Sequence, residues 1–334
     1  MSARGKKRKH KRPTIPKNIT DAPEISINGV NTSSNNEETV FNRFNKVGYN
    51  IESCAGNSIC VTKQLKQDQL VTIELSPEEW VFGEADLVAG WNVEDDGLTI
   101  TQNTVKYVNK KNEGIRTSDL LKYYDSFIGS WIFHNHVQKL EQSKGVILDA
   151  TLRAIEIGNR DVKKPDGSIV SEPESIFYTR GLLAVNRSDD KALSDAFEQG
   201  RIKYGSMGNI YFNKQCSYCG ALGLKTKKKD GRCIHQKIAL GQNVDTQYGL
   251  SKIVTYWSDM DEEGNKRFIQ FIEYSLLSTD PAFNGSAVWR QHNIDILKTK
   301  KPIRLQVDSK KLKKEAFKKY INNGSIKIIK QGDK

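Results

Sequence analysis

Short stretches of alternating apolar and polar residues dominate the middle of the chain. This two-residue period is typical of half-buried β-strands, and residues that favour turns (Asp, Gly and Asn) separate the stretches. The segments that predict strands are 70–75 (LVTIEL), 98–101 (LTIT), 145–152 (GVILDATL), 177–185 (FYTRGLLAV), 204–212 (YGSMGNIYF), 251–257 (SKIVTYW) and 267–277 (RFIQFIEYSLL). The pattern therefore predicts a strand-rich core.

A few segments have the apolar spacing of helices instead. Residues 188–200 begin with Ser-Asp-Asp, carry apolar residues on one side and end in Gly200, which predicts a well-capped helix. Residues 118–127 predict a second, shorter helix, and the lysine-rich residues 310–322 a basic amphipathic one. The Pro-Asp-Gly at 165–167 marks a loop or hairpin tip between two predicted strands.

Charge is concentrated at the two ends of the chain. The 334 residues carry a formal net charge of +12, of which residues 1–17 supply +8 and residues 298–334 supply +10. Residues 18–297 are therefore mildly acidic, with a net charge of −6. This distribution argues against a compact basic domain that binds nucleic acid.

Composition predicts one globular domain with basic appendages. We expect a disordered basic arm over residues 1–45, a folded domain over 46–291 and a basic C-terminal tail over 292–334. No apolar stretch is long enough for a transmembrane helix, and the polar N-terminus does not resemble a secretory signal.

A cysteine cluster predicts a metal site within an insertion at 213–240. Three thiols and an imidazole make a ligand set suited to tetrahedral zinc, and four protein ligands leave no open position for catalysis. The residues are Cys216, Cys219, Cys233 and His235. The alternative is four unconnected residues. The odd total of five cysteines argues against a secreted disulfide framework.

Three short segments contain the residue types that nucleophilic catalysis requires. A serine hydroxyl needs an imidazole to take its proton, and the imidazole needs a partner that fixes its tautomer. Ser206 lies between Gly205 and Gly208, His136 ends the run Phe-His-Asn-His, and Glu273 lies on a predicted strand. A serine between glycines is also common in ordinary turns, so these residue types alone do not establish a site.

The positions of the histidines limit which residue can act as the general base. Only His134 and His136 lie in the body of the domain outside the cysteine cluster. Together with Asn135 they spell the letters of an HNH nuclease, but in those enzymes the letters are spread over a ββα-metal unit. On a strand, the two histidines would share one face.

The order of segments resembles that of the prohead (capsid maturation) proteases of tailed phages, which share the herpesvirus assemblin fold. The resemblance covers residues 100–290 and rests on four motifs. They are YYDSFIGSWIFHNH at 123–136, DKALSDAFEQG at 190–200, Ser-Met-Gly at 206–208, and EYSLL at 273–277 before Pro-Ala at 281–282.

The resemblance implies His136 as general base, Ser206 as nucleophile and Glu273 as orienting acid, with Asp280 a rival for the third role. It implies an α+β fold: a closed, mostly antiparallel β-barrel flanked by helices, with an inserted zinc-knuckle loop and basic disordered ends. Some relatives carry a similar cysteine-rich insertion after the serine strand.

The implied activity is that of a serine endopeptidase inside the phage prohead, in the host cytoplasm and later the virion. Its expected partners are scaffold and major capsid proteins, further copies of itself, and DNA through the basic ends, with no membrane. The alternative is a catalytically inactive protease fold, serving as a structural or nucleic-acid-binding protein of the capsid interior with a structural zinc.

Overall fold

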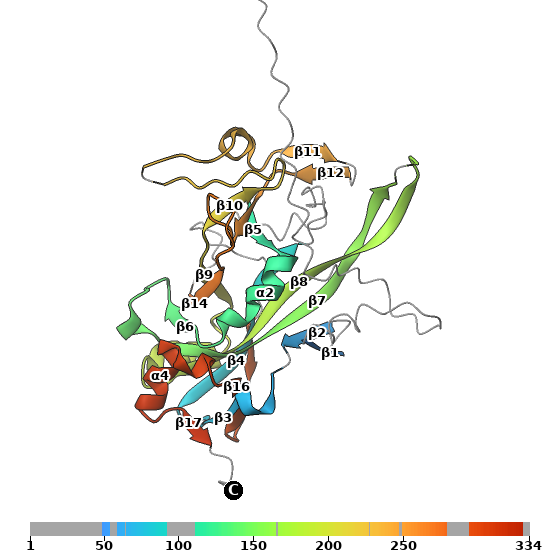
Figure 1. The fold of residues 1–334 in the computed structure, drawn as a ribbon. Helices are drawn as coiled ribbons and strands as arrows, with labels where there is room; N and C mark the ends of the chain where they lie inside the picture. The colour runs from blue at the N-terminus through green and yellow to red at the C-terminus, as the bar shows by residue number, and fades with distance from the viewer. Residues whose placement is uncertain are drawn as a thin grey trace, which may run out of the picture.

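A computed structural model of the chain is shown in Figure 1. It describes residues 49–53, 59–63, 65–91, 111–164, 166–226, 228–246, 249–278 and 294–329. The arm expected over 1–45, the strand expected over 98–101 and the acid candidate Asp280 lie outside the described residues.

One large sheet forms the body of the molecule. Its strands run in the order β10-β13-β5-β4-β8-β7-β6-β14-β9. Attached at the side are β1 (Tyr49–Ser53), β2 (Ile59–Lys63) and β15 (Ile294–Leu297). Most neighbours are antiparallel, while β5 is parallel to β4 and β13, and β6 to β14. The strands along this path are β4 (Trp80–Trp91), β5 (Glu113–Arg116), β6 (Trp131–His134), β7 (Gly145–Lys163), β8 (Ile169–Asn186), β9 (Tyr204–Ile210), β10 (Asn213–Cys216), β13 (Thr255–Ser258) and β14 (Gln270–Leu277).

The sheet curls into a half-barrel, so the expected closed barrel is not confirmed. The α+β class is confirmed, because the chain is mostly strands with few helices. The two ends of the strand path, β9 and β10, form no ladder with each other in the described residues. The chain passes from β9 to β10 within three residues, yet β10 pairs with β13 and β9 with β14.

The strands expected at 145–152 and 177–185 are parts of a longer hairpin. β7 and β8 stay paired through Lys163 and Ile169, and the ribbon extends beyond the sheet in Figure 1. At the tip, Gly167 has φ +85° and donates a hydrogen bond to the Lys164 carbonyl over 2.9 Å. The hairpin tip predicted here therefore forms, but β7 and β8 extend further toward it than the apolar pattern predicts.

The helices expected at 118–127 and 188–200 are confirmed, but their α-helical parts are shorter than predicted. α2 (Thr117–Tyr123) continues into a 3-10 turn that ends at Phe127, and α3 (Lys191–Glu198) is capped by Asp190. The Asp190 carboxylate accepts the Leu193 N–H over 2.9 Å, which satisfies one free donor of the first turn. In the described ranges, no helix has the length and apolarity needed to span a membrane.

The first hydrophobic core lies between the half-barrel and these helices. Phe127 and Phe271 stack there with ring centroids 4.0 Å apart, which ties the end of the α2 segment to β14. Ile132 of β6 and Tyr274 of β14 belong to the same core. This packing positions the strands that carry the candidate catalytic residues.

The C-terminal region is folded, so the expected disordered tail is wrong for residues 294–329. β15 (Ile294–Leu297) pairs with β4, while β16 (Ile303–Asp308) and β17 (Lys327–Ile329) pair with either side of β3 (Leu70–Leu75). In β16, Ile303, Leu305 and Val307 pack on a hydrophobic core while Arg304 and Gln306 are exposed, so the basic composition of this region does not prevent it from folding.

The helix α4 (Glu315–Asn322) anchors this region through a second core. Phe317 and Tyr320 are fully buried, and Tyr320 packs edge-on against Trp80 of β4. Each such side chain contributes about 1.5–3 kcal/mol through the apolar surface that it buries. α4 also packs on the turn before β6, where Gly129 has φ +74° and a Cβ would lie 2.9 Å from Phe317.

Candidate active site and metal centre

Two adjacent strands, β9 and β14, bring two of the candidate catalytic residues onto one face of the sheet. Ser206 of β9 lies directly opposite Ser275 of β14, and Gly208 lies opposite Glu273. Directly opposed residues of an antiparallel pair share a face, as do residues two apart on one strand. Ser206 and Glu273 are therefore diagonal neighbours on the same face.

The Glu273 carboxylate is held by two side chains. The Gln138 amide donates to one of its oxygens, and the Ser275 hydroxyl donates to the other over 3.4 Å. Burial raises the pKa of Glu273, while these two hydrogen bonds act in the opposite direction. Gly208 makes room for this carboxylate, because a Cβ there would lie 2.5 Å from its Oε1.

His136 lies in a tight turn rather than on a strand. β6 ends at His134, and the next two residues have positive φ, +48° for Asn135 and +62° for His136. The Val137 N–H donates to the His134 carbonyl over 3.1 Å, as in a type I′ turn. The expectation that both histidines share one strand face is therefore wrong.

The turn directs the following chain back over the face that carries Glu273, since Gln138 reaches its carboxylate. His136 is exposed within this returning segment. Loss of hydration lowers the pKa of His136, which keeps its imidazole neutral and able to accept a proton near pH 7.

The second histidine has a different partner. His134 Nε2 lies 2.7 Å from the Ser278 hydroxyl, and the Asn135 side chain accepts the Ser278 N–H over 3.1 Å. His134 is in register with Leu276, which packs in the core on the side of β14 opposite to Ser275. Its strand position therefore places it on the other face from Ser206.

Ser206 itself is buried, with only 2% of its surface exposed. Among the described residues its hydroxyl has no hydrogen-bond partner, so none links it to His136 or Glu273. The structure thus places Ser206 and Glu273 together on one face but does not bring His136 into hydrogen-bond contact with either. Access of a peptide to the hydroxyl requires this face to open.

A pocket of about 470 Å³ lies on the same face beside Glu273. Trp131 and Phe133 of β6 and Gln138 form one part of its lining, and Lys313 and Lys314 before α4 form another. Burial lowers the pKa of Lys314 to about 8, and its ammonium donates to the Ser126 carbonyl. The C-terminal region therefore contributes a wall next to the candidate site.

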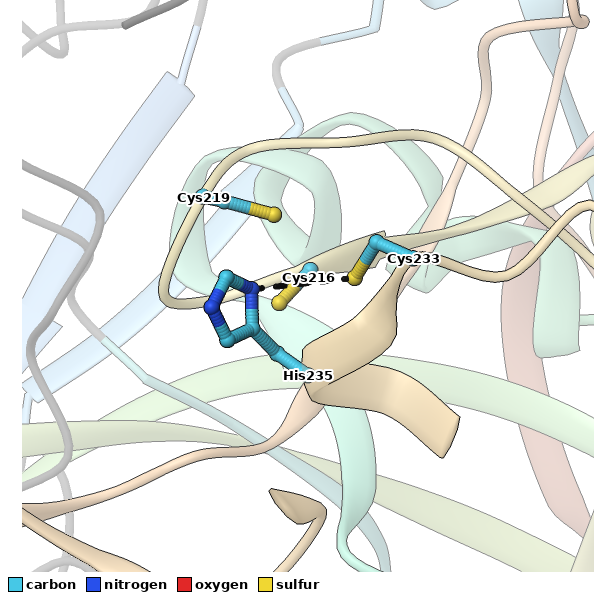
Figure 2. A group of neighbouring side chains, drawn as sticks. All are labelled: Cys216, Cys219, Cys233 and His235. Atoms are coloured by element: carbon cyan, nitrogen blue, oxygen red, sulfur yellow. Dashed lines mark hydrogen bonds between the residues drawn. The ribbon is translucent and has the colours of Figure 1, made fainter. Parts of the chain in front are cut away.

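The four predicted metal ligands come together. Figure 2 shows Cys216, Cys219, Cys233 and His235 pointing toward a common centre. Their ligand atoms all lie within 4.8 Å of one another, and Cys233 Sγ is 4.0 Å from His235 Nδ1. In a tetrahedral zinc site with Zn–S of about 2.3 Å, ligand atoms are about 3.5–3.8 Å apart. The cluster is therefore compatible with a zinc site.

Burial makes two cysteine thiols of the cluster hard to ionise unless a cation binds beside them. Burial raises the pKa of Cys216 to about 12, and burial also raises the pKa of Cys219. Three thiols this close together carry charge favourably only beside a bound cation. The ligands come from the end of β10 and from the segment around the π-helical turn His235–Ala239, so a bound metal would join the two ends of the insertion.

Sequence reasoning missed three residues of this region: Gln138, Ser275 and Ser278. The position of Ser275 could have been predicted from the sequence, because it follows Glu273 by two residues and residues two apart on a strand share a face. The positions of Gln138 and Ser278 could not, since their roles depend on the turn at Asn135–His136.

Comparison with known proteins found no matching family model, no similar curated protein and no similar solved structure. The geometry of the sites and the sequence motifs are therefore the basis for a functional assignment.

Proposed function

We propose that the protein is a serine endopeptidase of the prohead-protease type, which cleaves scaffold and capsid proteins during phage head maturation. The observation that carries this proposal is the shared face of β9 and β14, on which Ser206 and Glu273 are diagonal neighbours. The turn at Asn135–His136 adds support, because it returns the chain over that face.

In the proposed reaction, Ser206 Oγ attacks a peptide carbonyl carbon while His136 takes its proton. The C–N bond then breaks, the leaving amine receives the proton from His136, and an ester to Ser206 remains. Water attacks this ester with His136 again as base, which releases the acid product and restores the serine. Glu273 is the proposed group that orients the imidazole, and Gln138 and Ser275 hold its carboxylate.

The proposed cofactor is one structural zinc ion, held by the three cysteines and His235. It would supply a cross-link between β10 and the π-helical turn, and no catalytic step depends on it. A four-ligand site leaves no position for water or substrate.

The second candidate function is that of an inactive protease fold, with a structural or nucleic-acid-binding role inside the capsid. The burial of Ser206, and the absence of a hydrogen bond between it and His136 among the described residues, favour this candidate. Mass spectrometry distinguishes the two: peptides of co-expressed scaffold and capsid proteins should show new termini with the native chain and none with Ser206→Ala.

Gly208→Ala tests whether the position of Glu273 matters. The added Cβ would displace the carboxylate, so kcat/KM for peptide cleavage should fall about a hundredfold. Glu273→Asp, one methylene shorter, should restore part of the loss when combined with Gly208→Ala. Kinetics of the two single variants and the double variant measure this coupling.

Gly231→Ala is the matched control, because the nearest atom to its Cβ would be 3.6 Å away and its activity should be unchanged. Full activity of Gly208→Ala would contradict the proposed role of Glu273 and leave that of Ser206 standing.

A further inference from the structure

The segment between β6 and β7 reaches the candidate active site and is held at both of its ends. Residues 135–142, here called the strap, are all exposed. At one end, the Asn135 N–H donates to the Leu276 carbonyl over 3.0 Å. At the other end, Ser143 is buried, and the Lys319 ammonium donates to its hydroxyl over 3.0 Å. The strap is therefore a loop with two fixed ends and a solvated middle.

One side chain joins the middle of the strap to the sheet, through the hydrogen bond from the Gln138 amide to the Glu273 carboxylate. Among the described residues, this is the only hydrogen bond between residues 136–142 and any residue outside 134–143. One hydrogen bond contributes little to stability beside the solvation that replaces it. The middle of the strap can therefore leave the sheet while its two ends stay in place.

Gln138 occupies a position that the proposed mechanism assigns to an imidazole. In that mechanism Glu273 orients His136, but the Gln138 amide donates to one carboxylate oxygen and the Ser275 hydroxyl to the other. Loss of hydration is the only cause that lowers the pKa of His136, so no carboxylate acts on it in this arrangement. His136 precedes Gln138 by two residues, which span at most about 7 Å of chain. A short movement of the strap is therefore enough to exchange the two side chains.

The pocket beside Glu273 connects substrate binding to the strap. Gln138 and Leu140 of the strap line this pocket of about 470 Å³, together with Glu273 and Trp131. The Leu140 side chain is also 55% exposed, so it is not held in a core. A peptide side chain in the pocket therefore contacts the strap and the Gln138–Glu273 bond together.

We propose that Gln138 is a latch that restrains the enzyme until substrate binds. A peptide in the pocket draws Gln138 away from Glu273, and His136 takes the place of the amide at the carboxylate. The inference rests on the proposed function, because it keeps the roles assigned there to His136 and Glu273. It accounts for the burial of Ser206 and for the bond that Glu273 makes to Gln138 instead of His136.

Replacing Gln138 with alanine in the full chain tests the latch without knowledge of the natural substrate. NMR titration follows the His136 imidazole, whose signal is identified by its loss in His136→Asn. We expect a higher pKa for His136 in Gln138→Ala than in the native chain, because a neighbouring carboxylate favours the charged imidazole. The rise should be absent when Glu273→Gln is added.

The second readout is the rate at which a fluorophosphonate labels Ser206. The native chain reacts whenever the strap opens by itself, so labelling should be about tenfold faster in Gln138→Ala. A residue that only supports Glu273 would give the opposite result, since its loss would slow the reaction.

Gln142→Ala is the matched control, because Gln142 is exposed on the same strap and its side chain has no hydrogen bond among the described residues. Its His136 pKa and its labelling rate should equal those of the native chain. An unchanged His136 pKa in Gln138→Ala, or slower labelling of Ser206, would overturn the latch and leave Ser206 as the proposed nucleophile. A raised His136 pKa with no adduct on Ser206 in any of these chains would support the exchange and overturn the proposed function.

Discussion

Replacing Ser206 with alanine is expected to lower the rate of peptide cleavage by about a thousandfold or more. The variant lacks the only atom that forms the acyl bond in the proposed mechanism. Its fold should be unaffected, because the Ser206 hydroxyl has no hydrogen-bond partner to lose among the described residues. Initial rates and thermal unfolding of the same preparation separate the two effects.

Ser275→Ala is the control for that experiment, because Ser275 lies directly opposite Ser206 and is fully buried. It loses a hydrogen bond to Glu273 but no reacting atom, so its rate should fall only about tenfold. Cleavage that persists in Ser206→Ala, or that falls equally in Ser275→Ala, would contradict the role of Ser206 as nucleophile.

Replacing Cys216 with serine is expected to abolish zinc binding and to unfold the insertion. The Cys216 side chain is 1% exposed, and a hydroxyl is a much poorer zinc ligand than a thiolate. Zinc binding contributes roughly 10–16 kcal/mol in small structural sites, so its loss should strongly destabilise the insertion. Elemental analysis should find one zinc per native chain and far less than one in the variant.

Hydrogen exchange locates the effect, since amides of residues 213–240 should lose protection in Cys216→Ser while those of β7 and β8 keep it. Cys60→Ser, on β2 (Ile59–Lys63), is the control cysteine and should retain one zinc. A native chain with well under one zinc per molecule would contradict the proposed metal site.

Local chemistry predicted the elements of this fold well. The two-residue alternation predicted the strands β3, β7, β8, β9, β13 and β14, and the Ser-Asp-Asp at 188–190 predicted where α3 begins. The metal ligands were also predictable, because their residue types and short spacing constrain their geometry before folding. These features depend on residues that are close together in the sequence, so one sequence is enough to predict them.

Features that depend on distant contacts were not predictable. The turn at Asn135–His136 is held by hydrogen bonds between Asn135 and both Leu276 of β14 and Ser278 just after it. Asn and His tolerate positive φ better than most residues, but the letters FHNH do not show that the chain turns there. The lysine-rich C-terminus packs because Phe317 and Tyr320 reach a core completed by Trp80 of β4. Closure of the sheet likewise depends on the relative placement of β9 and β10.

Covalent labelling with a fluorophosphonate tests the central claim most directly. An activated serine attacks the phosphorus and fluoride leaves, so the reaction requires a working nucleophile but no knowledge of the natural substrate. We predict one adduct per native chain, located by peptide mapping on Ser206 and absent from Ser206→Ala and from denatured protein. No adduct on Ser206 in the folded chain, or an adduct on Ser278 beside His134 instead, would contradict the assignment.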